Sequence, residues 1–349
     1  ADEKTSEYEM YVPFDEFEEE AEHLYKHGNE RGLDGRFNVS REFISYKKGY
    51  TTYIYSAPYS GKTQFAMSEL TYLAERYDWN IAVFSLEMGS PKDVLAEAAS
   101  IYIGKLYTSR SSDLKMNGLQ KEKAIEFFKQ RFYVLDPVFK KNDIEVTVDN
   151  ILKEVKKIED KQGINIDAVY IDPISELDDG GEERIHKFTY KVNKMVNRDA
   201  RMNDRHNFLV SHVRDQQGIL DKVENKTYYP VPTPRDVSGG QNTFKQGYQM
   251  VCVYRPPDFV INDKTKEFHK KNGTEVHIQK SKPKGVGKTG QFTLFFDWKT
   301  NRYYEDAACT VYSDPLSEEK QEELTLPTDY SQPISKENDD WMDIKDEAP

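Results

Sequence analysis

Short apolar runs alternate with helical patterns along most of the chain, and this alternation limits the possible folds more than any other feature. Runs rich in β-branched and aromatic residues predict strands, and apolar residues at helical spacing predict helices between them. Strands separated by helices favour a mostly parallel sheet covered by helices on both faces. The expected strands are 51–57, 80–88, 131–136, 166–174, 206–213, 249–256, 275–282 and 290–305, and the expected helices are 62–77, 91–103, 119–131, 147–160 and 182–204.

The two ends of this series differ from its middle. The last three expected strands have no helical pattern between them, so we expect them to form an antiparallel edge. Residues 11–30 have apolar residues near helical spacing within an acidic segment, which predicts an amphipathic helix that ends near Gly28. Beyond Asp314 the sequence is acidic and rich in Pro and Ser, and we expect a disordered tail.

The net charge of −12 is unevenly distributed over the 349 residues. Residues 1–22 hold ten acidic residues and one basic residue, and residues 313–349 hold twelve acidic and three basic residues. The middle of the chain, 23–312, therefore carries +6, so the bulk charge does not exclude binding to phosphates. Both acidic ends are equally well explained as solubilising segments.

Two further features bear on the location of the protein. No apolar run approaches the roughly 20 residues that span a bilayer. Only two cysteines occur, Cys252 and Cys309, which argues against a disulfide framework or a zinc site and favours a reducing interior. We therefore expect a cytoplasmic protein without a membrane span.

The segment "SAPYSGKT" lies between an expected strand and an expected helix, and it ends like a Walker A phosphate-binding loop. Gly61 allows the backbone to approach a phosphate closely, Lys62 supplies a positive charge, and the Thr63 hydroxyl suits Mg²⁺. The amino end of the following helix adds its partial positive charge to the same site. Ser56 stands where the general motif has Gly. The residues expected to hold the phosphates are Ser56, Ala57, Pro58, Tyr59, Ser60, Gly61, Lys62 and Thr63.

Three polar side chains lie at or just beyond the ends of other expected strands. Asp172 ends "AVYID", Glu87 follows "AVFSL", and His212 ends "FLVSH". The carboxyl ends of parallel strands line a common ligand crevice, so we expect these side chains to face Lys62. Nucleotide hydrolysis needs a carboxylate that supports the metal and a group that positions water, and Asp172 and Glu87 suit these roles. A single histidine at a strand end is more often structural.

The motifs "SAPYSGKTQFAM", "FSLEM", "VYIDPISEL", "FLVSHVR", "PRDVSGG" and "VYR" occur in this order, and together they resemble those of DnaB-type replicative ring helicases, which include Twinkle and phage helicases. The resemblance covers about residues 30–305, and "SLEM" is its most specific part. It implies a RecA-like P-loop NTPase core that binds ATP and Mg²⁺ and hydrolyses ATP. The stand-alone core and divergent sequence favour a phage origin.

The resemblance also implies roles for individual residues. Glu87 corresponds to the catalytic glutamate, Asp172 to the acid that supports Mg²⁺, and His212 to a sensor of the γ-phosphate. Loop 213–236 corresponds to the channel loop that touches single-stranded DNA, and its candidate phosphate contacts are Arg214, Lys222 and Lys226. Each of these bases is otherwise explained as a solvated surface charge.

In this family a neighbouring subunit completes each ATP site with cations, often as Lys-x-Arg. Here the corresponding residues are Lys280 and Lys282, and Arg255 corresponds to a further arginine near the interface. A lysine at position 282 cannot make the planar fork of a guanidinium, so hydrolysis is expected to be slow unless Arg255 compensates. The alternative for Arg255 is a surface charge at a strand end.

These observations predict three regions: a helix and linker for subunit docking (1–40), a RecA-like ATPase domain (41–312) and the acidic tail (313–349). The helix could equally pack on its own domain. The expected partners are single-stranded DNA, further copies of the chain in a hexameric ring, and primase or other replisome proteins. Two alternatives stay open, namely a RecA/RadA-like recombination ATPase and a degenerate relative that binds nucleotide without turning it over.

Overall fold

The computed structural model describes residues 10–312 except 142, 179–183, 214–218, 222–225, 238, 257–258, 262–267 and 271–272. The expected acidic tail, 313–349, lies outside the described residues. None of the described helices is long and apolar enough to cross a membrane.

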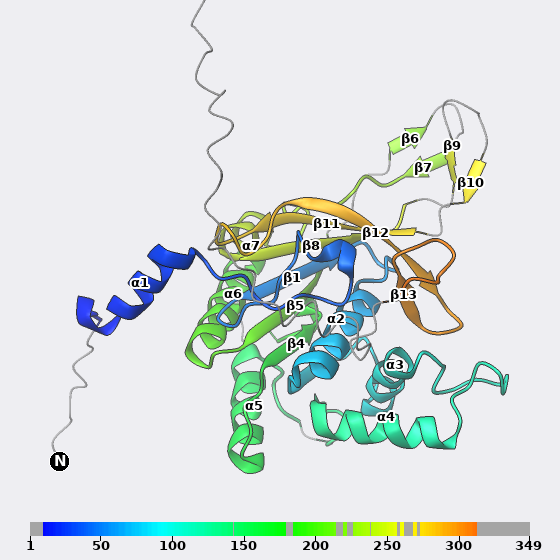
Figure 1. The fold of residues 1–349 in the computed structure, drawn as a ribbon, viewed down its shortest axis with the longest axis horizontal. Helices are drawn as coiled ribbons and strands as arrows, with labels where there is room; N and C mark the ends of the chain where they lie inside the picture. Colours follow the sequence, from blue (N-terminus) through cyan, green and yellow to red (C-terminus); the bar gives the residue numbers. More distant parts are fainter. Residues whose placement is uncertain are drawn as a thin grey trace, which may run out of the picture. The chain divides into compact units, whose positions relative to one another are not determined.

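A nine-stranded mixed sheet forms the centre of the described fold (Figure 1). Its strand order is β13-β12-β11-β8-β1-β5-β4-β2-β3, and β1 pairs in parallel with both β5 and β8. The strands of this sheet are β1 (Thr51–Ser56), β2 (Ile81–Ser85), β3 (Phe132–Leu135), β4 (Ala168–Asp172), β5 (His206–His212), β8 (Gln249–Tyr254), β11 (Gly273–Ser281), β12 (Gly290–Asp297) and β13 (Arg302–Tyr304). Two small hairpins pair β6 (Ile219–Asp221) with β7 (Lys226–Tyr228) and β9 (Phe259–Ile261) with β10 (Phe268–Lys270).

Helices lie on both faces of the sheet, as the alternation of elements predicts. The α-helices are α1 (Glu18–His27), α2 (Lys62–Tyr77), α3 (Pro91–Ile103), α4 (Gly118–Arg131), α5 (Val148–Gln162), α6 (Ile185–Met202) and α7 (Gly240–Gln246). Several begin or end where capping rules place them: α3 starts after Ser90 in a capping box with Pro91 at its first position, and α5 ends at Gly163, which has a φ of 66°.

Two apolar cores sandwich the sheet, because successive strand residues point to opposite faces. On β1, Ile54 packs into the core under α2 and α3, while Tyr53 and Tyr55 pack into the core under α5 and α6. The strands are buried on both sides, which explains why their sequences are nearly continuous apolar runs.

The antiparallel edge differs in detail from the prediction. β8, β11, β12 and β13 pair antiparallel with one another in succession, as expected. On its other side β8 is parallel to β1, and the short helix α7, which was not predicted, leads into it. The single strand expected over 290–305 is a hairpin of β12 and β13. Asn301 at its turn has a φ of 56°, a conformation that asparagine tolerates better than most residues.

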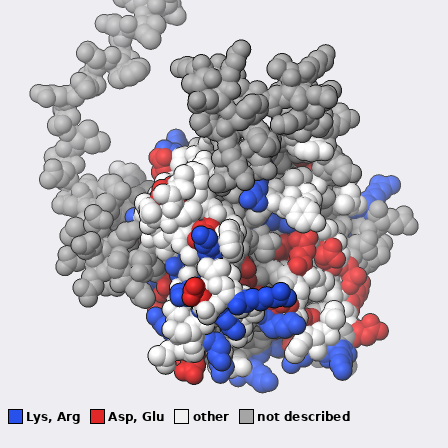
Figure 2. All heavy atoms as spheres, turned by 90° about the vertical axis from the view of Figure 1, so that its right-hand side faces the viewer, with Lys and Arg blue, Asp and Glu red and all other residues white. Residues whose placement is uncertain are grey.

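Basic side chains are unevenly spread over the surface. In Figure 2 the Lys and Arg side chains gather on the lower part of the face, at the level of α4 in Figure 1. Five exposed bases lie in α4 and the segment before it, namely Arg110, Lys115, Lys121, Lys123 and Lys129. The positive charge of the middle of the chain is therefore partly concentrated on the outside of α4, beyond the elements that carry the expected phosphate site.

Candidate nucleotide site

The strand–turn–helix unit predicted around Gly-Lys-Thr is present. β1 is fully buried and ends at Ser56, residues 57–61 form the turn, and α2 begins at Lys62. Gly61 has a φ of 88°, and a Cβ built there would lie 2.3 Å from the hydroxyl of Tyr303. Position 61 therefore requires glycine for its conformation and for the space it leaves.

The carboxylates predicted at this edge lie at hydrogen-bond distance from the phosphate-loop residues. Lys62 Nζ is 3.2 Å from Glu87 Oε2, and the Thr63 hydroxyl donates to Asp172 Oδ2 at 3.1 Å. β4 and β2 are neighbours, and Ser85 pairs with Asp172 in their parallel register. The sheet topology thus brings together three segments that are far apart in the sequence.

His212 joins the same group of residues. It is the last residue of β5 and pairs in register with Ser56, the last residue of β1. Its Nε2 lies 2.5 Å from Glu87 Oε1, so Glu87 contacts Lys62 through one oxygen and His212 through the other. Lys62, Glu87 and His212 form a continuous polar chain along the carboxyl ends of the strands.

Electrostatics distinguish the two carboxylates. Burial raises the pKa of Glu87, but the hydrogen bond with His212 and the charge of Lys62 outweigh it, so the net shift is downward. Burial dominates at Asp172 and raises its pKa, although Tyr170 and Lys62 act in the opposite direction. The half-exposed Glu87 is therefore a stable anion, whereas the buried Asp172 lacks sufficient positive charge around it.

The residues around Asp172 fit a magnesium ion. Asp172 Oδ1 is buried and has no hydrogen-bond partner among the described residues, while Oδ2 is held by Thr63 and Tyr170. A hydroxyl and a carboxylate are hard oxygen donors of the kind that Mg²⁺ prefers, and Mg²⁺ commonly uses one or two protein ligands together with phosphate and water. No group of three or more His, Cys, Asp or Glu side chains suited to a metal occurs in the described part of the chain. The donor set therefore suits a metal that arrives with a nucleotide.

Two tyrosines at the site were absent from the sequence-based prediction. Tyr170 lies two residues before Asp172 on β4, is fully buried, and donates to Asp172 Oδ2 at 2.7 Å. The period of two along a strand is a signal that could have identified it. Tyr303, which packs beside Gly61, comes from β13 and carries no such signal.

The three cations predicted on the later strands occupy different environments. Arg255 is exposed and directly follows β8, whose carboxyl end lies beside that of β1, so it is at the same edge of the sheet as Lys62. Lys282 is exposed just after β11. Lys280 is only 7% exposed, and its ammonium donates to the backbone carbonyl oxygens of Phe244 and Lys245 at the end of α7.

Lys280 is thus engaged inside its own subunit. Burial, together with the charge of Lys282, lowers its pKa to about 8. An ammonium at the carboxyl end of a helix stabilises carbonyl groups that have no partner within the helix. This arrangement does not present Lys280 at the surface, where the predicted contact with a neighbouring subunit would require it.

The predicted DNA contacts lie mostly outside the described residues. Arg214 and Lys222 are not described, and for Lys226 the structure gives the backbone, in β7, but not the side chain. Residues 229–237 at the carboxyl side of this loop are described, and they return the chain to the sheet at a bridge between Val213 and Val237.

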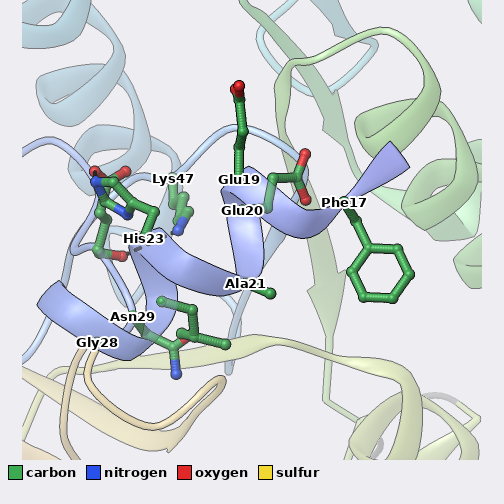
Figure 3. A pocket seen from close by; sticks show the side chains of 10 residues that line it. Phe17, Glu19, Glu20, Ala21, His23, Gly28, Asn29 and Lys47 are labelled. Atoms are coloured by element: carbon green, nitrogen blue, oxygen red, sulfur yellow. Dashed lines mark hydrogen bonds and ion pairs between the residues drawn. The ribbon is translucent and has the colours of Figure 1, made fainter. Parts of the chain in front are cut away.

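The predicted amino-terminal helix is present as α1, and it ends at Gly28 as expected. None of its residues is buried, and the apolar side chains of Phe17 and Leu24 are 39% and 51% exposed. Figure 3 shows the hollow beside α1, with Phe17 near the start of the helix and Gly28 at its end. This hollow has a volume of about 720 Å³ and is also lined by Lys47 from the segment before β1.

A phosphate-loop turn, two carboxylates and a histidine at the carboxyl edge of a mostly parallel sheet define a P-loop nucleotide site on a RecA-like fold. Two solved structures share this fold. One, an ATPase domain, superposes with a TM-score of 0.63 at 19% identity, covering 83% of this chain and 98% of that one. The other, described as a DnaB-like replicative helicase and its interactions with primase, superposes with a TM-score of 0.61 at 18% identity, covering 84% of this chain and 67% of that one.

Sequence comparison identifies the family. The DnaB-like helicase C terminal domain matches residues 42–305, and the chain belongs to this family. The replicative DNA helicase DnaB of Nostoc sp. is 27% identical over 135 residues, which is 38% of this chain and 15% of that protein. Family membership confirms the predicted resemblance to DnaB-type helicases, and the solved structures confirm the predicted RecA-like fold.

Proposed function

We propose that this chain is the ATP-hydrolysing motor of a replicative ring helicase, which moves along single-stranded DNA and separates the duplex. The main support is the convergence of Lys62, Glu87, Asp172 and His212 from four strand ends in a member of the DnaB-like family. The chain covers 15% of the DnaB protein that it matches, so the activity of a whole helicase is part of the proposal.

The contacts suggest how the site works. The backbone N–H groups of residues 57 and 59–61, the amino end of α2 and Lys62 would hold the phosphates of ATP. Thr63 and Asp172 would hold Mg²⁺, which neutralises charge on the phosphates when it is bound. Glu87 would orient the attacking water and accept its proton, because its carboxylate is ionised at neutral pH and one of its oxygens contacts His212.

The same contacts suggest a link between nucleotide and DNA. Lys62 is paired with Glu87 in this structure, and a bound phosphate would compete for that ammonium. The charge around Glu87 would then change, and His212, which touches Glu87, directly precedes loop 213–236. We infer that His212 transmits the state of the phosphate to a loop that contacts single-stranded DNA through Arg214, Lys222 and Lys226.

Assembly into a homo-oligomeric ring, a hexamer by analogy with the family, would place each ATP between two subunits. Lys282 is exposed and could reach a neighbouring site, and the exposed Arg255 could add a guanidinium there. The exposed apolar side chains of α1 suit a second copy of this chain, as a helix that docks in a neighbour's groove. This layout makes 1–40 a docking segment, 41–312 the motor and 313–349 an acidic tail, in a cytoplasmic protein that works with primase or other replisome proteins.

A combined assay would test the proposal. ATP turnover should be measured with and without single-stranded DNA, and unwinding of a forked duplex should be scored on the same sample that is imaged by electron microscopy. We expect DNA-stimulated turnover, unwinding and closed rings. Open filaments without unwinding would support a recombination-type ATPase, and nucleotide binding without turnover would support a degenerate relative, the outcome that a lysine at position 282 would help to explain.

A further inference from the structure

The two sides of loop 213–236 are attached to the sheet in different ways. The amino-terminal side leaves β5 at His212, whose ring contacts Glu87 at the nucleotide site. The carboxyl-terminal side, residues 229–237, is here called the return segment. Its backbone is held at Tyr229, whose carbonyl accepts a hydrogen bond of 2.9 Å from the hydroxyl of Tyr254 on β8.

The side chain of Gln279 on β11 attaches the return segment to the sheet at a second point, Pro232. Its side-chain carbonyl accepts a hydrogen bond of 2.8 Å from the hydroxyl of Tyr55, and its side-chain NH₂ donates to the carbonyl oxygen of Pro232 at 2.8 Å. Tyr55 is 1% exposed, and Pro232 is also buried. Both ends of the amide are thus used, and only one orientation of the amide satisfies both contacts.

The register of the sheet explains how Tyr55 reaches a strand that is not its neighbour. Tyr55 pairs with Cys252 on β8, and Cys252 pairs with His277 on β11. Gln279 lies two residues beyond His277, at an irregularity where the register of β11 with β8 shifts between Ile278 and Lys280. Such an extra residue re-aims a side chain, and here the Gln279 amide reaches the hydroxyl of Tyr55.

The return segment is also ordered from within. Asp236 accepts hydrogen bonds from both the backbone N–H and the hydroxyl of Thr233, at 2.7 and 2.9 Å. Val237 is 1% exposed and forms a bridge with Val213. The contact with Gln279 therefore joins a locally rigid turn to β1, the strand that leads into the phosphate loop.

We propose that Gln279 is a positioning residue that fixes the return segment to β1 and β11, and that the binding of single-stranded DNA depends on this attachment. This inference rests on the proposed function. The return segment is held against the sheet at Tyr229, Pro232 and Val237, so its position is tied to β1, the strand that leads into the phosphate loop. Neither Gln279 nor Tyr55 touches the phosphate-loop residues through its side chain in the described contacts.

Two substitutions that preserve side-chain size would test the role. Tyr55→Phe removes the hydroxyl and Gln279→Leu removes the amide, while Tyr53→Phe is the matched control. Tyr53 lies on the same strand and face, but its hydroxyl faces Asn197 on α6 at 3.4 Å and not the loop. The measurements are basal ATP turnover, the concentration of single-stranded DNA that gives half-maximal stimulation, and amide hydrogen exchange of residues 233–237 without DNA or nucleotide.

For both test variants we expect unchanged basal turnover, faster exchange in the return segment, and a roughly three- to tenfold higher half-maximal DNA concentration, the range expected for a lost buried hydrogen bond. The double variant should show no more than the larger single effect, because both changes break one connection. Unchanged exchange and unchanged DNA dependence in both variants would refute the inference, as would a parallel fall of basal and stimulated turnover.

A failure of the proposed function can be told apart from a failure of the role proposed for Gln279. If the unaltered chain shows no DNA stimulation, the DNA-binding role of the loop is wrong, and the positioning role for DNA is wrong with it. Hydrogen exchange in the variants then still decides whether Gln279 anchors the return segment.

Discussion

Polar residues at the carboxyl ends of the parallel strands contact one another, whereas Lys280 on β11 and Lys282 just after it lie outside that network in the described contacts. Lys62, Glu87 and His212 come from three elements and form one chain of contacts. Lys280 instead holds the end of α7, and Lys282 is exposed. The reason is strand direction. Parallel strands bring their carboxyl ends to one edge, whereas β11 is antiparallel to β8 and ends at the opposite edge, where Ser281 pairs with Gln249 at the start of β8.

The largest effect is expected from Lys62→Ala, which removes the positive charge from the phosphate loop. In the unaltered protein the Lys62 ammonium would stabilise the transferred phosphoryl group. Without it, ATP turnover should fall by about 10³-fold or more. A steady-state ATPase assay measures it, and Lys121→Ala, an exposed lysine on α4, is the control. Undiminished turnover in the Lys62 variant would remove the phosphate-loop assignment.

Glu87→Gln should reduce turnover by about 10²-fold while leaving nucleotide binding intact, since an amide cannot accept the proton from water. Because the net shift of the Glu87 pKa is below its ordinary value of 4.5, its protonation should not slow the enzyme as the pH falls to about 5. Pre-steady-state turnover and nucleotide titration at several pH values measure both effects. Glu122→Gln, on the surface of α4, is the control and should keep full turnover. Full turnover in the Glu87 variant would mean that another residue accepts the proton.

α1 differs from both groups of residues, because the apolar side chains of Phe17 and Leu24 are exposed in the single subunit. In the double variant Phe17→Ser and Leu24→Ser, the subunit concentration needed for ring assembly should rise by about tenfold or more. Each of the two original side chains would otherwise bury apolar surface in a neighbour. Sedimentation velocity over a dilution series measures this shift, and Tyr25→Ser provides an exposed control. Assembly that is unchanged in the double variant would mean that α1 docks nothing.

The smallest effect is expected from Lys280→Ala. Loss of the ammonium at the end of α7 should destabilise the fold by about 1–2 kcal/mol and lower the Tm by a few °C, because two carbonyl groups lose a charged donor. Lys282→Ala, an exposed change in the same segment, should leave the Tm nearly unchanged. If instead Lys280→Ala abolished turnover at an unchanged Tm, Lys280 would belong to the site of a neighbouring subunit.

Local rules were sufficient for most elements of the fold. The range of α2 was predicted to the residue, because a fully buried strand, a turn with Gly61 and an apolar helical pattern follow one another without ambiguity. α7 was missed because it is only seven residues long and contains three residues of low helix propensity, Gly240, Asn242 and Thr243. Without α7, the parallel direction of β8 could not be predicted.

The sequence by itself determined the edge of the sheet at which the polar residues lie, because residues that end or closely follow parallel strands all lie at the same edge. It therefore predicted Lys62, Glu87, Asp172 and His212 as a group. Only the tertiary structure decided which atoms meet across that edge, and it alone placed Lys280 against α7 and Gln279 between Tyr55 and Pro232. Those contacts join residues that are far apart in the chain, and no local pattern encodes the order in which strands enter a sheet.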